Sequence, residues 1–494
     1  MNRKKRFSKG QISAIRATGI TKVVTWQTFH DFFGADGRLL DSVDDAVLIF
    51  QGGFDGDELG IHRIILDRPI TIVGDYKILE AVFREIAIDI VSGGVTIDGL
   101  GLKASSYLGD LIRVQTSGVT LCNMRIEYRC GEESSDAISI HGEETISDVI
   151  VRNNRIVFVS HVPDDTHHAT AINMDNAKDL VVEHNTIRVS IPALFAKNIR
   201  RDYFMMGLNA INALRICEAE SVTVTGNSVR VMVNGSGKKY ISCHVIFIAG
   251  SNAIRIEDNA ITLKDTHTPQ GSIIAICGVL CGYSRGVQFI RNRFDLATRG
   301  GVSTGGAMQG INHTDCNETE IRENTFYCNS RGPVSAIFLT SMKGGRSDVS
   351  IVKNTIQVSG YAKDESPFAL VSGVEIQNTV ASVLNNSILV SNKNKEYHSG
   401  FPVVGVGYVQ RLGGSVSFDV QDNTIRTNGE YTVFTENSNV QNVNVTGNHL
   451  TAAKRTGDDS VSVRTAESVL IENAGRRRSE TNQRHMPWLK KIHR

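Results

Sequence analysis

A short unit of apolar and polar positions recurs along this chain. An apolar–x–apolar pair is followed two residues later by asparagine and then by x–apolar, as in Val-Thr-Val-Thr-Gly-Asn-Ser-Val at 222–229. Neighbouring copies are 25 to 42 residues apart, a spacing typical of stacked units that cannot bury their apolar faces alone. The asparagines of the copies are Asn154, Asn185, Asn227, Asn259, Asn292, Asn324, Asn354, Asn386, Asn423 and Asn448.

Two earlier copies show which way the asparagine position points. The segments 95–102 and 119–126 follow the same pattern, but Leu100 and Met124 stand where the later copies have asparagine. A position that accepts a large apolar side chain or an amide is predicted to face the interior. Amides stacked there can hydrogen-bond along the axis, which is the condition for burying them. We therefore expect a structural role for these asparagines.

A second apolar segment lies between successive asparagines, for example at 137–140, 171–174 and 245–248. Each repeat thus supplies at least two short strands, without a helical period between them. Parallel stacking of successive coils explains this best. The sequence predicts an all-β chain that forms a parallel β-helix of roughly 10 to 12 coils, on the order of 50–60 Å long.

The predicted organisation has four parts. Residues 1–24 are a basic N-terminal segment, 25–45 an N-terminal cap, 46–472 the β-helix, and 473–494 a basic tail that we expect to be disordered. The cap contains a short amphipathic helix, with Thr25 as its N-cap and Trp26, Phe29 and Phe33 on one face.

Charge is unevenly distributed, although the net charge is +1. Residues 1–10 hold five Lys and Arg, and residues 476–494 hold seven with one Glu, so the rest of the chain carries about −10. That balance disfavours nucleic acid on the wall of the β-helix. The basic ends are predicted to be solvated tails, or alternatively a tether to an anionic surface or polymer.

Targeting signals and cysteine pairs are not evident from the sequence. No apolar run reaches the ~18 residues of a membrane span, and no apolar region follows the basic start, so we expect no signal peptide. The eight cysteines include no Cys-x-x-Cys pair, which favours buried free thiols over a zinc site or disulfides.

With these features, residues 46–472 resemble the right-handed parallel β-helix repeats of the pectin lyase-like superfamily. The resemblance rests on the copies from Asn154 to Asn448, on Pro-Ile-Thr-Ile-Val-Gly at 69–74, and on Val-Thr-Ile-Asp-Gly-Leu at 95–100. The segment 29–37 looks like the start of microbial adhesin-like β-helix proteins. Such proteins are often extracellular, and they either bind glycans and proteins or act on polysaccharides.

Loop length marks the candidate site, because the longest interval between copies separates Asn185 from Asn227. Segments that emerge from adjacent coils at equivalent points are neighbours in space. His161 and the other polar residues of 160–168 are therefore expected to face 191–207, with 238–240 beside them; a solvated polar loop is the alternative. The predicted ligand-binding residues are His167, His168, Lys197, Tyr203, Lys238 and Tyr240.

The resemblance implies two chemistries for these segments. A lyase would use Arg200 or Arg201 as base, with Ca²⁺ held by Asp164 and Asp165. A glycosidase would use Asp164, Asp165 and Asp202 as its acid–base set. The segment 135–140, Ser-Asp-Ala-Ile-Ser-Ile, is similar to the aspartate-bearing strand of polygalacturonases, but the paired aspartate and the Gly-His-Gly companion motif are missing. Apart from Ca²⁺ in a lyase, no cofactor is expected, since no nucleotide-binding or serine-hydrolase motif occurs.

Three functional hypotheses follow. The first is a non-catalytic β-helix scaffold that displays variable loops to glycans or partner proteins. The second is a polysaccharide lyase or glycoside hydrolase with its site on residues 161–203. The third is a structural protein whose basic ends attach it to nucleic acid or membrane. The sugar, the partner and the oligomeric state stay open.

Overall fold

The computed structural model describes most of the chain from Thr21 to Asn473. The described residues are 21–43, 46–105, 108–130, 135–160, 169–191, 211–234, 241–265, 274–298, 308–341, 348–361, 371–377, 379–394, 403–408, 416–435, 440–463 and 466–473.

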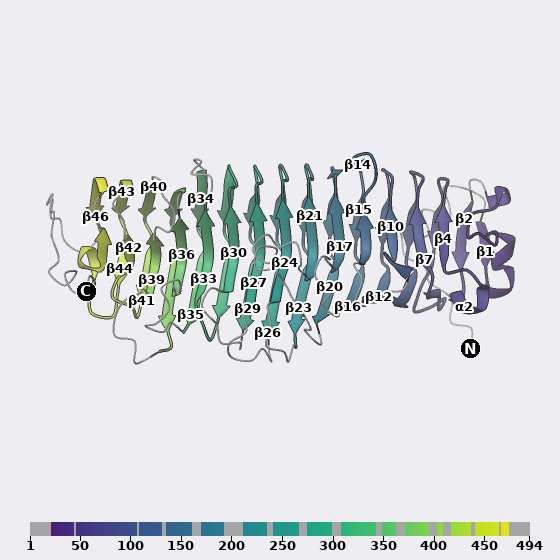
Figure 1. Cartoon of the computed structure of the whole chain (residues 1–494), viewed down its shortest axis with the longest axis horizontal. Coiled ribbons are helices and arrows are strands. Elements are labelled where there is room, and N and C mark those ends of the chain that lie inside the picture. The colour runs from purple at the N-terminus through teal and green to yellow at the C-terminus, as the bar shows by residue number, and fades with distance from the viewer. Residues whose placement is uncertain are drawn as a thin grey trace.

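Each coil of the chain contributes one strand to each of three parallel sheets (Figure 1). From β19 (Val181–Glu183) in sheet I, the chain turns at Asn185 into β20 (Thr186–Ile191) in sheet II. It continues to β21 (Ile211–Cys217) in sheet III and returns to sheet I as β22 (Thr223–Thr225), which pairs with β19 in parallel. This path is a parallel β-helix, as the sequence predicts.

The strands are as follows. Sheet I consists of β1 (Thr21–Val24), β2 (Val47–Phe50), β5 (Thr71–Val73), β8 (Thr96–Asp98), β11 (Thr120–Cys122), β15 (Ile150–Arg152), β19, β22, β25 (Arg255–Glu257), β28 (Gln288–Ile290), β31 (Thr319–Arg322), β34 (Asp348–Val352), β37 (Val380–Leu384), β40 (Val416–Gln421), β43 (Val440–Thr446) and β46 (Ala466–Glu472). Sheet II consists of β3 (Gly53–Asp55), β6 (Val82–Arg84), β9 (Gly101–Ser105), β12 (Arg125–Cys130), β16 (Arg155–Ser160), β20, β23 (Ser228–Val233), β26 (Ala260–Asp265), β29 (Arg293–Thr298), β32 (Thr325–Asn329), β35 (Thr355–Gly360), β38 (Ser387–Asn392), β41 (Thr424–Thr427) and β44 (His449–Thr451). Sheet III consists of β4 (Arg63–Leu66), β7 (Ala87–Ile90), β10 (Ile112–Val114), β13 (Asp136–Ile140), β17 (Ala169–Asp175), β21, β24 (Ile241–Ala249), β27 (Ile274–Gly282), β30 (Met308–Thr314), β33 (Val334–Thr340), β36 (Val371–Gln377), β39 (Val403–Tyr408), β42 (Val433–Thr435) and β45 (Val461–Val463). A small extra sheet pairs β14 (Ile146–Ser147) with β18 (Ala177–Lys178).

The stack of strands is longer than the ten to twelve coils expected from the sequence. Sheet I has 16 strands in the described part of the chain, and sheets II and III have 14 each. At about 4.8 Å per strand, sheet I extends about 70 Å. The sequence estimate was too short because it counted asparagine copies, and strands such as β2 and β5 precede the first asparagine.

The interior is filled by the alternate residues of all three sheets. In β20, Ile187, Val189 and Ile191 are buried, while Arg188 between them is exposed. Leu100 and Met124 are also buried, at 0% and 1% exposure, which confirms that the asparagine position faces inward. One apolar core runs continuously from Val24 to Leu450.

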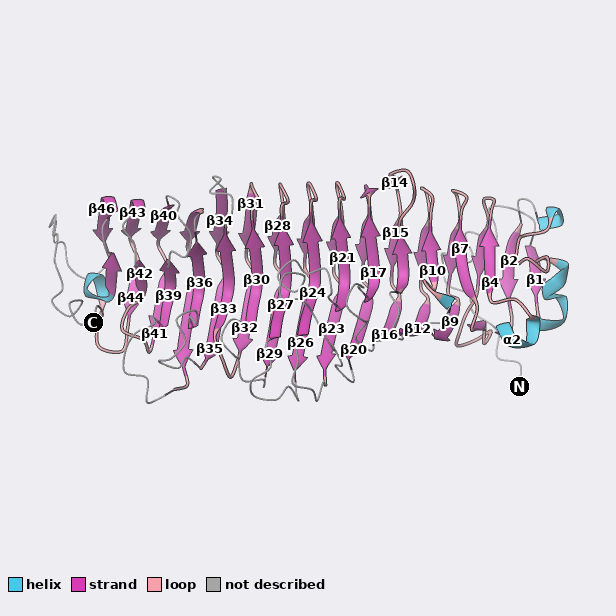
Figure 2. Ribbon diagram, in the orientation of Figure 1, coloured by secondary structure: helices cyan, strands magenta, loops and turns pink. Residues whose placement is uncertain are grey.

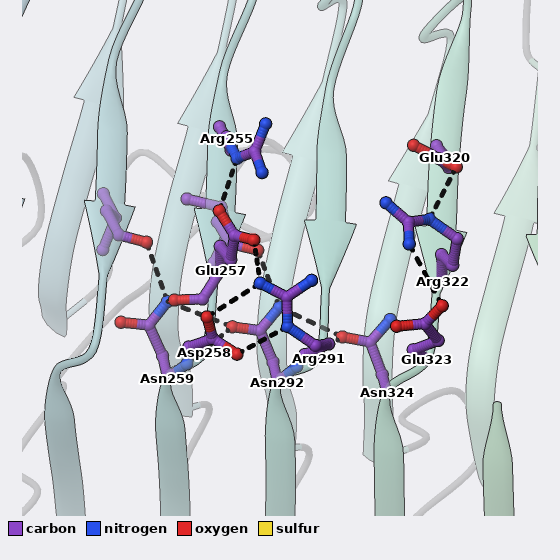
Figure 3. Close-up of polar contacts among 12 residues, drawn as sticks. Arg255, Glu257, Asp258, Asn259, Arg291, Asn292, Glu320, Arg322, Glu323 and Asn324 are labelled. Atoms are coloured by element: carbon purple, nitrogen blue, oxygen red, sulfur yellow. Dashed lines mark hydrogen bonds and ion pairs between the residues drawn. The ribbon is translucent and has the colours of Figure 1, made fainter.

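The buried asparagines form a continuous hydrogen-bonded stack at the corner between sheets I and II (Figure 3). Asn259 Nδ2 donates to Asn292 Oδ1 at 3.0 Å and to the carbonyl of Val224 at 2.8 Å. The backbone N–H of Asn259 donates to the same Asn292 oxygen at 3.0 Å. The preceding Asp258 has a φ of 55°, so this left-handed residue makes the tight turn. Every coil from Asn154 onward repeats this arrangement.

The two ends of the stack are hydrogen-bonded to different kinds of groups. At the first end, the N–H of Met124 donates to Asn154 Oδ1 at 2.9 Å. At the last end, Asn473 Nδ2 donates to Asp458 Oδ1 at 2.8 Å, and Asp458 belongs to the 3-10 helix η4 (Gly457–Ser460). The stack therefore ends on a carboxylate rather than on another amide.

Ion pairs line the solvent side of the same corner (Figure 3). Arg291 Nε lies 2.9 Å from Asp258 Oδ1, and Arg291 also contacts Glu257. Arg255 Nε is 2.5 Å from Glu257 Oε2, and this hydrogen bond lowers the pKa of Glu257. These pairs are exposed on at least one side, so solvent screens them and they contribute little to stability.

Short helices lie at the two ends of the strand stack (Figure 2). The N-terminal ones are η1 (Trp26–Asp31), η2 (Asp41–Val43) and α2 (Gly56–Leu59). Thr25 is the N-cap of η1, and its N–H donates to Thr28 Oγ1 at 3.0 Å. Phe29 and Phe33 are fully buried, with ring centroids 4.8 Å apart. Sheet I begins with β1, within the segment that the sequence assigns to the basic N-terminal part.

All eight cysteines are free and buried, which confirms the sequence interpretation. Burial raises the pKa of thiols such as Cys122 and Cys277 to about 12, so they are unreactive at neutral pH. In the described part of the chain, no helix has the length and apolar character needed to cross a membrane.

Candidate functional site

The predicted site residues lie outside the described residues. This applies to His161, to the catalytic candidates Asp164, Asp165, Arg200, Arg201 and Asp202, and to the ligand-binding candidates His167, His168, Lys197, Tyr203, Lys238 and Tyr240. In the chain, 161–168, 192–210 and 235–240 each connect a strand of sheet II to a strand of sheet III. The outer faces of sheets II and III are therefore the described surfaces next to these segments.

A row of polar side chains runs along the outer face of sheet III in its first coils. In β17, Ile172 and Met174 belong to the core, so the alternate residues Asn173 and Asp175 face outward. The strand register aligns Asn173 with Ser139 of β13 and with Arg215 of β21. Further toward the N-terminus, the same row holds Arg113 and Asp89.

Asp136 is the most perturbed carboxyl group on this face. Its Oδ1 accepts the N–H of Thr170 at 3.0 Å, and its own N–H donates to Asp110 Oδ1 at 2.9 Å. Burial and the nearby charge of Asp110 raise the pKa of Asp136 well above its ordinary value, against hydrogen bonding with Asn173 and the charge of Arg215. Asp136 thus keeps its proton to higher pH than an ordinary aspartate.

Arginines pair with polar side chains on the coils before and after Asp136. Arg113 Nε lies 3.7 Å from Asp110 Oδ2, and Arg215 Nη1 lies 3.0 Å from Asp175 Oδ2 and 2.9 Å from Asn173 Oδ1. Asp110 and Asp136 occupy equivalent positions on adjacent coils, two residues before the paired Ile112 and Ile138. Two carboxyl groups on adjacent coils, of which Asp136 has a raised pKa, are the elements of acid–base chemistry.

Sequence reasoning located Asp136 only within the segment 135–140 and missed Asp110. Asp110 lies 26 residues before Asp136, one coil earlier, so aligning the coils on one another would have paired them.

In the later coils, the outer face of sheet III becomes less polar. His244 stacks near Phe247, with centroids 5.8 Å apart, and burial lowers the pKa of His244 to about 3.

Sheet II carries a groove of about 610 Å³ on its outer face, which runs from β26 to Lys393 just after β38. Six of its polar lining residues are Lys264, Asp295, Tyr327, Asn329, Gln357 and Lys393. These come from successive strands, so their spacing is fixed by the sheet. The groove therefore presents hydroxyl, amide, ammonium, carboxylate and aromatic groups side by side.

Contacts between coils hold these groove side chains in place. Lys264 Nζ is 4.0 Å from Asp295 Oδ2, and Lys393 Nζ donates to the Ser330 carbonyl at 3.2 Å and to Asn329 Oδ1. The guanidinium of Arg293 lies over the Tyr327 ring, 4.8 Å from its centroid. Burial, together with the charge of Arg331, lowers the pKa of Lys393.

For metal binding, the described residues contain no cluster of three or more His, Cys, Asp or Glu side chains suited to hold an ion. The expected Ca²⁺ ligands of a lyase, Asp164 and Asp165, lie outside the described residues.

Comparisons with known proteins give no family for this chain. No family model matches it, and no curated protein matches it. Among solved structures, the Streptococcus pneumoniae surface protein and adhesin PfbA is similar, with 10% identity over 91% of this chain and 100% of that chain, at a TM-score of 0.30. The catalytic unit of the GH87 α-1,3-glucanase from Streptomyces thermodiastaticus shares 13% identity over 91% of this chain and 66% of that one, at 0.30. DFA-IIIase from Arthrobacter chlorophenolicus, without its lid, shares 13% identity over 90% and 94%, at 0.31.

Proposed function

We propose that this protein is a glycan-binding β-helix and that the groove on sheet II is its sugar site. The observation that carries the proposal is the groove itself. A concave surface of about 610 Å³ combines an aromatic ring, Tyr327, with amide and charged groups from adjacent coils. A sugar offers hydroxyl groups at its edges and C–H groups on its faces, and this lining can satisfy both.

Preorganisation supports the proposal. Arg293 fixes the Tyr327 ring, and Asn329 and Ser330 hold Lys393, so fewer side chains need to be ordered when a ligand binds. Five strands from β26 to β38 span about 19 Å at ~4.8 Å per step. That length suits an oligosaccharide segment of a polymer better than a single sugar.

The test is a panel of neutral and acidic polysaccharides, measured for binding with and without Ca²⁺. We expect at least one polysaccharide to bind, and Tyr327→Ala and Gln357→Ala each to weaken binding about tenfold. Tyr283→Ala is the matched control, because Tyr283 is 56% exposed at a turn away from the groove. Binding that survives both groove substitutions would contradict the assignment.

Glycoside hydrolysis is the second candidate function, favoured by the Asp110–Asp136 pair on sheet III. Asp136 would protonate the leaving oxygen and Asp110 would act as nucleophile, because one strand spacing is near the ~5 Å carboxyl separation of retaining enzymes. Asp136 is 4% exposed, and this burial places hydrolysis second to binding. The test is whether the protein releases new reducing ends from these polysaccharides. Release that is lost in Asp136→Asn and Asp110→Asn but kept in Tyr283→Ala would make hydrolysis the favoured function.

We also propose that η1 and the residues around it cap the first coils. The Phe29 ring centroid lies 5.7 Å from that of Phe54, and the Phe33 ring centroid lies 6.2 Å from that of Phe50. A solenoid needs such a cover, because its end coils otherwise expose their apolar interior.

A further inference from the structure

Two cysteine sulfurs are in contact inside the core, at the corner where sheet III leads into sheet I. Cys281 Sγ lies 3.5 Å from Cys316 Sγ, and both residues are fully buried. Cys281 is near the end of β27, and Cys316 lies in the next coil, between β30 and β31. The two thiols therefore belong to adjacent coils, which are ~4.8 Å apart.

Cys316 occupies a position that the two preceding coils fill with serine. The backbone N–H of Ala219 donates to Ser251 Oγ at 3.2 Å, and that of Ser251 donates to Ser284 Oγ at 3.1 Å. The N–H of Ser284 donates in the same way to Cys316 Sγ at 3.4 Å, and this thiol donates to the Thr314 carbonyl at 3.3 Å. Because a hydroxyl completes the same turn in the earlier coils, the fold does not require a sulfur here.

The surroundings of the pair favour a thiolate at Cys316. The hydrogen bond from Cys281 lowers the pKa of Cys316, against the effect of burial. The same contact, together with burial, raises the pKa of Cys281 well above its ordinary value, so Cys281 keeps its proton. Burial raises the pKa of other thiols, such as Cys217 and Cys328, to about 12. Since oxidants react with the thiolate, Cys316 is more readily oxidised than these thiols.

We infer that Cys281 and Cys316 form an oxidation site, at which a hydroperoxide converts the two thiols into a disulfide that links adjacent coils. The Cys316 thiolate attacks one oxygen of hydrogen peroxide, the O–O bond breaks, and the departing hydroxide takes up a proton to become water. Cys316 is then a sulfenic acid. The Cys281 sulfur attacks the Cys316 sulfur, the S–O bond breaks, and the leaving hydroxide forms a second water with the Cys281 proton. The two thiols lose two electrons, and the peroxide gains them.

A small movement is enough to form this bond. Bonded sulfurs are about 2.05 Å apart, so the two Sγ atoms must approach by about 1.5 Å from their present contact. Rotations about the Cα–Cβ bonds of the two cysteines can supply this movement. Because both sulfurs are buried, the oxidant must be small. Hydrogen peroxide is barely larger than water and can reach them when the coils open locally.

The disulfide would connect the coil of β26 to β28 with the coil of β29 to β31. A covalent link between residues far apart in the chain restricts the unfolded state, so it should stabilise these coils under oxidising conditions. The inference is independent of the sugar groove, because the sulfurs lie in the core and the groove lies on the outer face of sheet II.

The experiment treats the folded full chain with hydrogen peroxide, blocks the remaining thiols with N-ethylmaleimide after denaturation, and maps the peptides without reductant. We expect one linked pair of peptides, which contains Cys281 and Cys316 and has a mass roughly 2 Da below the sum of its parts. Dithiothreitol should separate the pair. The midpoint of thermal unfolding should rise after oxidation and return after reduction.

Cys316→Ser is the test variant, because serine completes the same turn at Ser251 and Ser284 and should keep the corner folded. It should give no linked peptides and no shift in the unfolding midpoint with peroxide. In Cys281→Ala, Cys316 should stop at the sulfenic acid, which dimedone traps. Cys122→Ser is the matched control, because Cys122 is buried on β11, and it should still form the link.

Three results would overturn the inference. The first is a folded protein in which peroxide produces no link between Cys281 and Cys316. The second is a set of linked peptides that join other cysteines in similar amounts. The third is a peroxide-induced shift in the unfolding midpoint that Cys316→Ser retains in full.

Discussion

Asn292 donates from Nδ2 to Asn324 Oδ1 at 3.0 Å, and its backbone N–H donates to the same oxygen at 2.8 Å. Asn292 Oδ1 in turn accepts both donors of Asn259. Every polar atom of this buried amide is thus used, and each asparagine completes the turn of its neighbour. The stack supports the fold and leaves no donor or acceptor for a ligand.

Asn292→Asp should strongly destabilise the protein. A carboxylate there would face the Ile256 carbonyl and Asn324 Oδ1, which now accept from Nδ2. We expect a loss of about 3 kcal/mol or more in the free energy of unfolding, measured with denaturant at pH 7. Asn385→Asp, exposed in the equivalent turn two coils beyond Asn324, should cost less than ~0.5 kcal/mol. Equal losses in the two variants would contradict an inward amide stack.

Stability should fall as pH rises above the ordinary aspartate pKa, because of Asp136. An unfolded aspartate ionises near pH 3.8, whereas folded Asp136 keeps its proton to higher pH. Between these two pKa values the folded state binds more protons than the unfolded state, so raising the pH favours unfolding. Asp136→Asn should remove this contribution while its Oδ1 still accepts the Thr170 N–H. Unfolding curves from pH 4 to 8 test this, with exposed Asp459→Asn as control; an unchanged pH profile in Asp136→Asn would refute it.

His313 should produce the opposite trend on the acid side. Burial lowers its pKa from 6.5 to about 4, and its Nε2 lies 2.8 Å from Thr319 Oγ1. As pH falls from 6.5 towards 4, the unfolded imidazole gains a proton that the folded one does not, so stability decreases by roughly 2 kcal/mol. His313→Gln should abolish this part of the acid loss in thermal unfolding, whereas the exposed His449→Gln should not.

Phe29→Ala should loosen the N-terminal coils and leave distant coils intact. Truncating a buried phenylalanine costs about 3–5 kcal/mol, and repeat proteins lose stability locally when an end is uncovered. Hydrogen exchange should therefore accelerate for backbone amides of β2 to β9 but not for those beyond β30. Ile78→Ala, 46% exposed near the same end, is the control. Uniform acceleration along the whole chain would show that the coils unfold as one unit.

The fold was largely predictable because the same pattern of buried and exposed residues recurs in every coil of a solenoid. The asparagine spacing, with Leu100 and Met124 in the same position, was enough to predict an inward stack and parallel sheets. The number of coils could not be predicted in this way, because strands such as β2 and β5 are not followed by an asparagine of the stack.

The functional surfaces were harder to predict, for two reasons. The sequence drew attention to 161–203, and those residues lie outside the described part of the chain. The side chains of sheet III, such as Asp110 and Arg215, meet only once the register of successive coils is known. The outward arginines of sheet II had a readable signal, since alternation in Arg-Ile-Glu-Tyr-Arg at 125–129 places Arg125 and Arg129 outside. A charge averaged over the whole body concealed it.

The carboxylate of Asp458 at the end of the asparagine stack limits how this chain can be lengthened. Each internal asparagine accepts hydrogen bonds from the coil before it and donates to the coil after it. An inserted coil with its own asparagine would therefore extend the stack. Asp458 accepts from Asn473 and, when ionised, offers no side-chain donor in return. A duplicated coil should therefore be tolerated between Asn292 and Asn324 but not after Asn473.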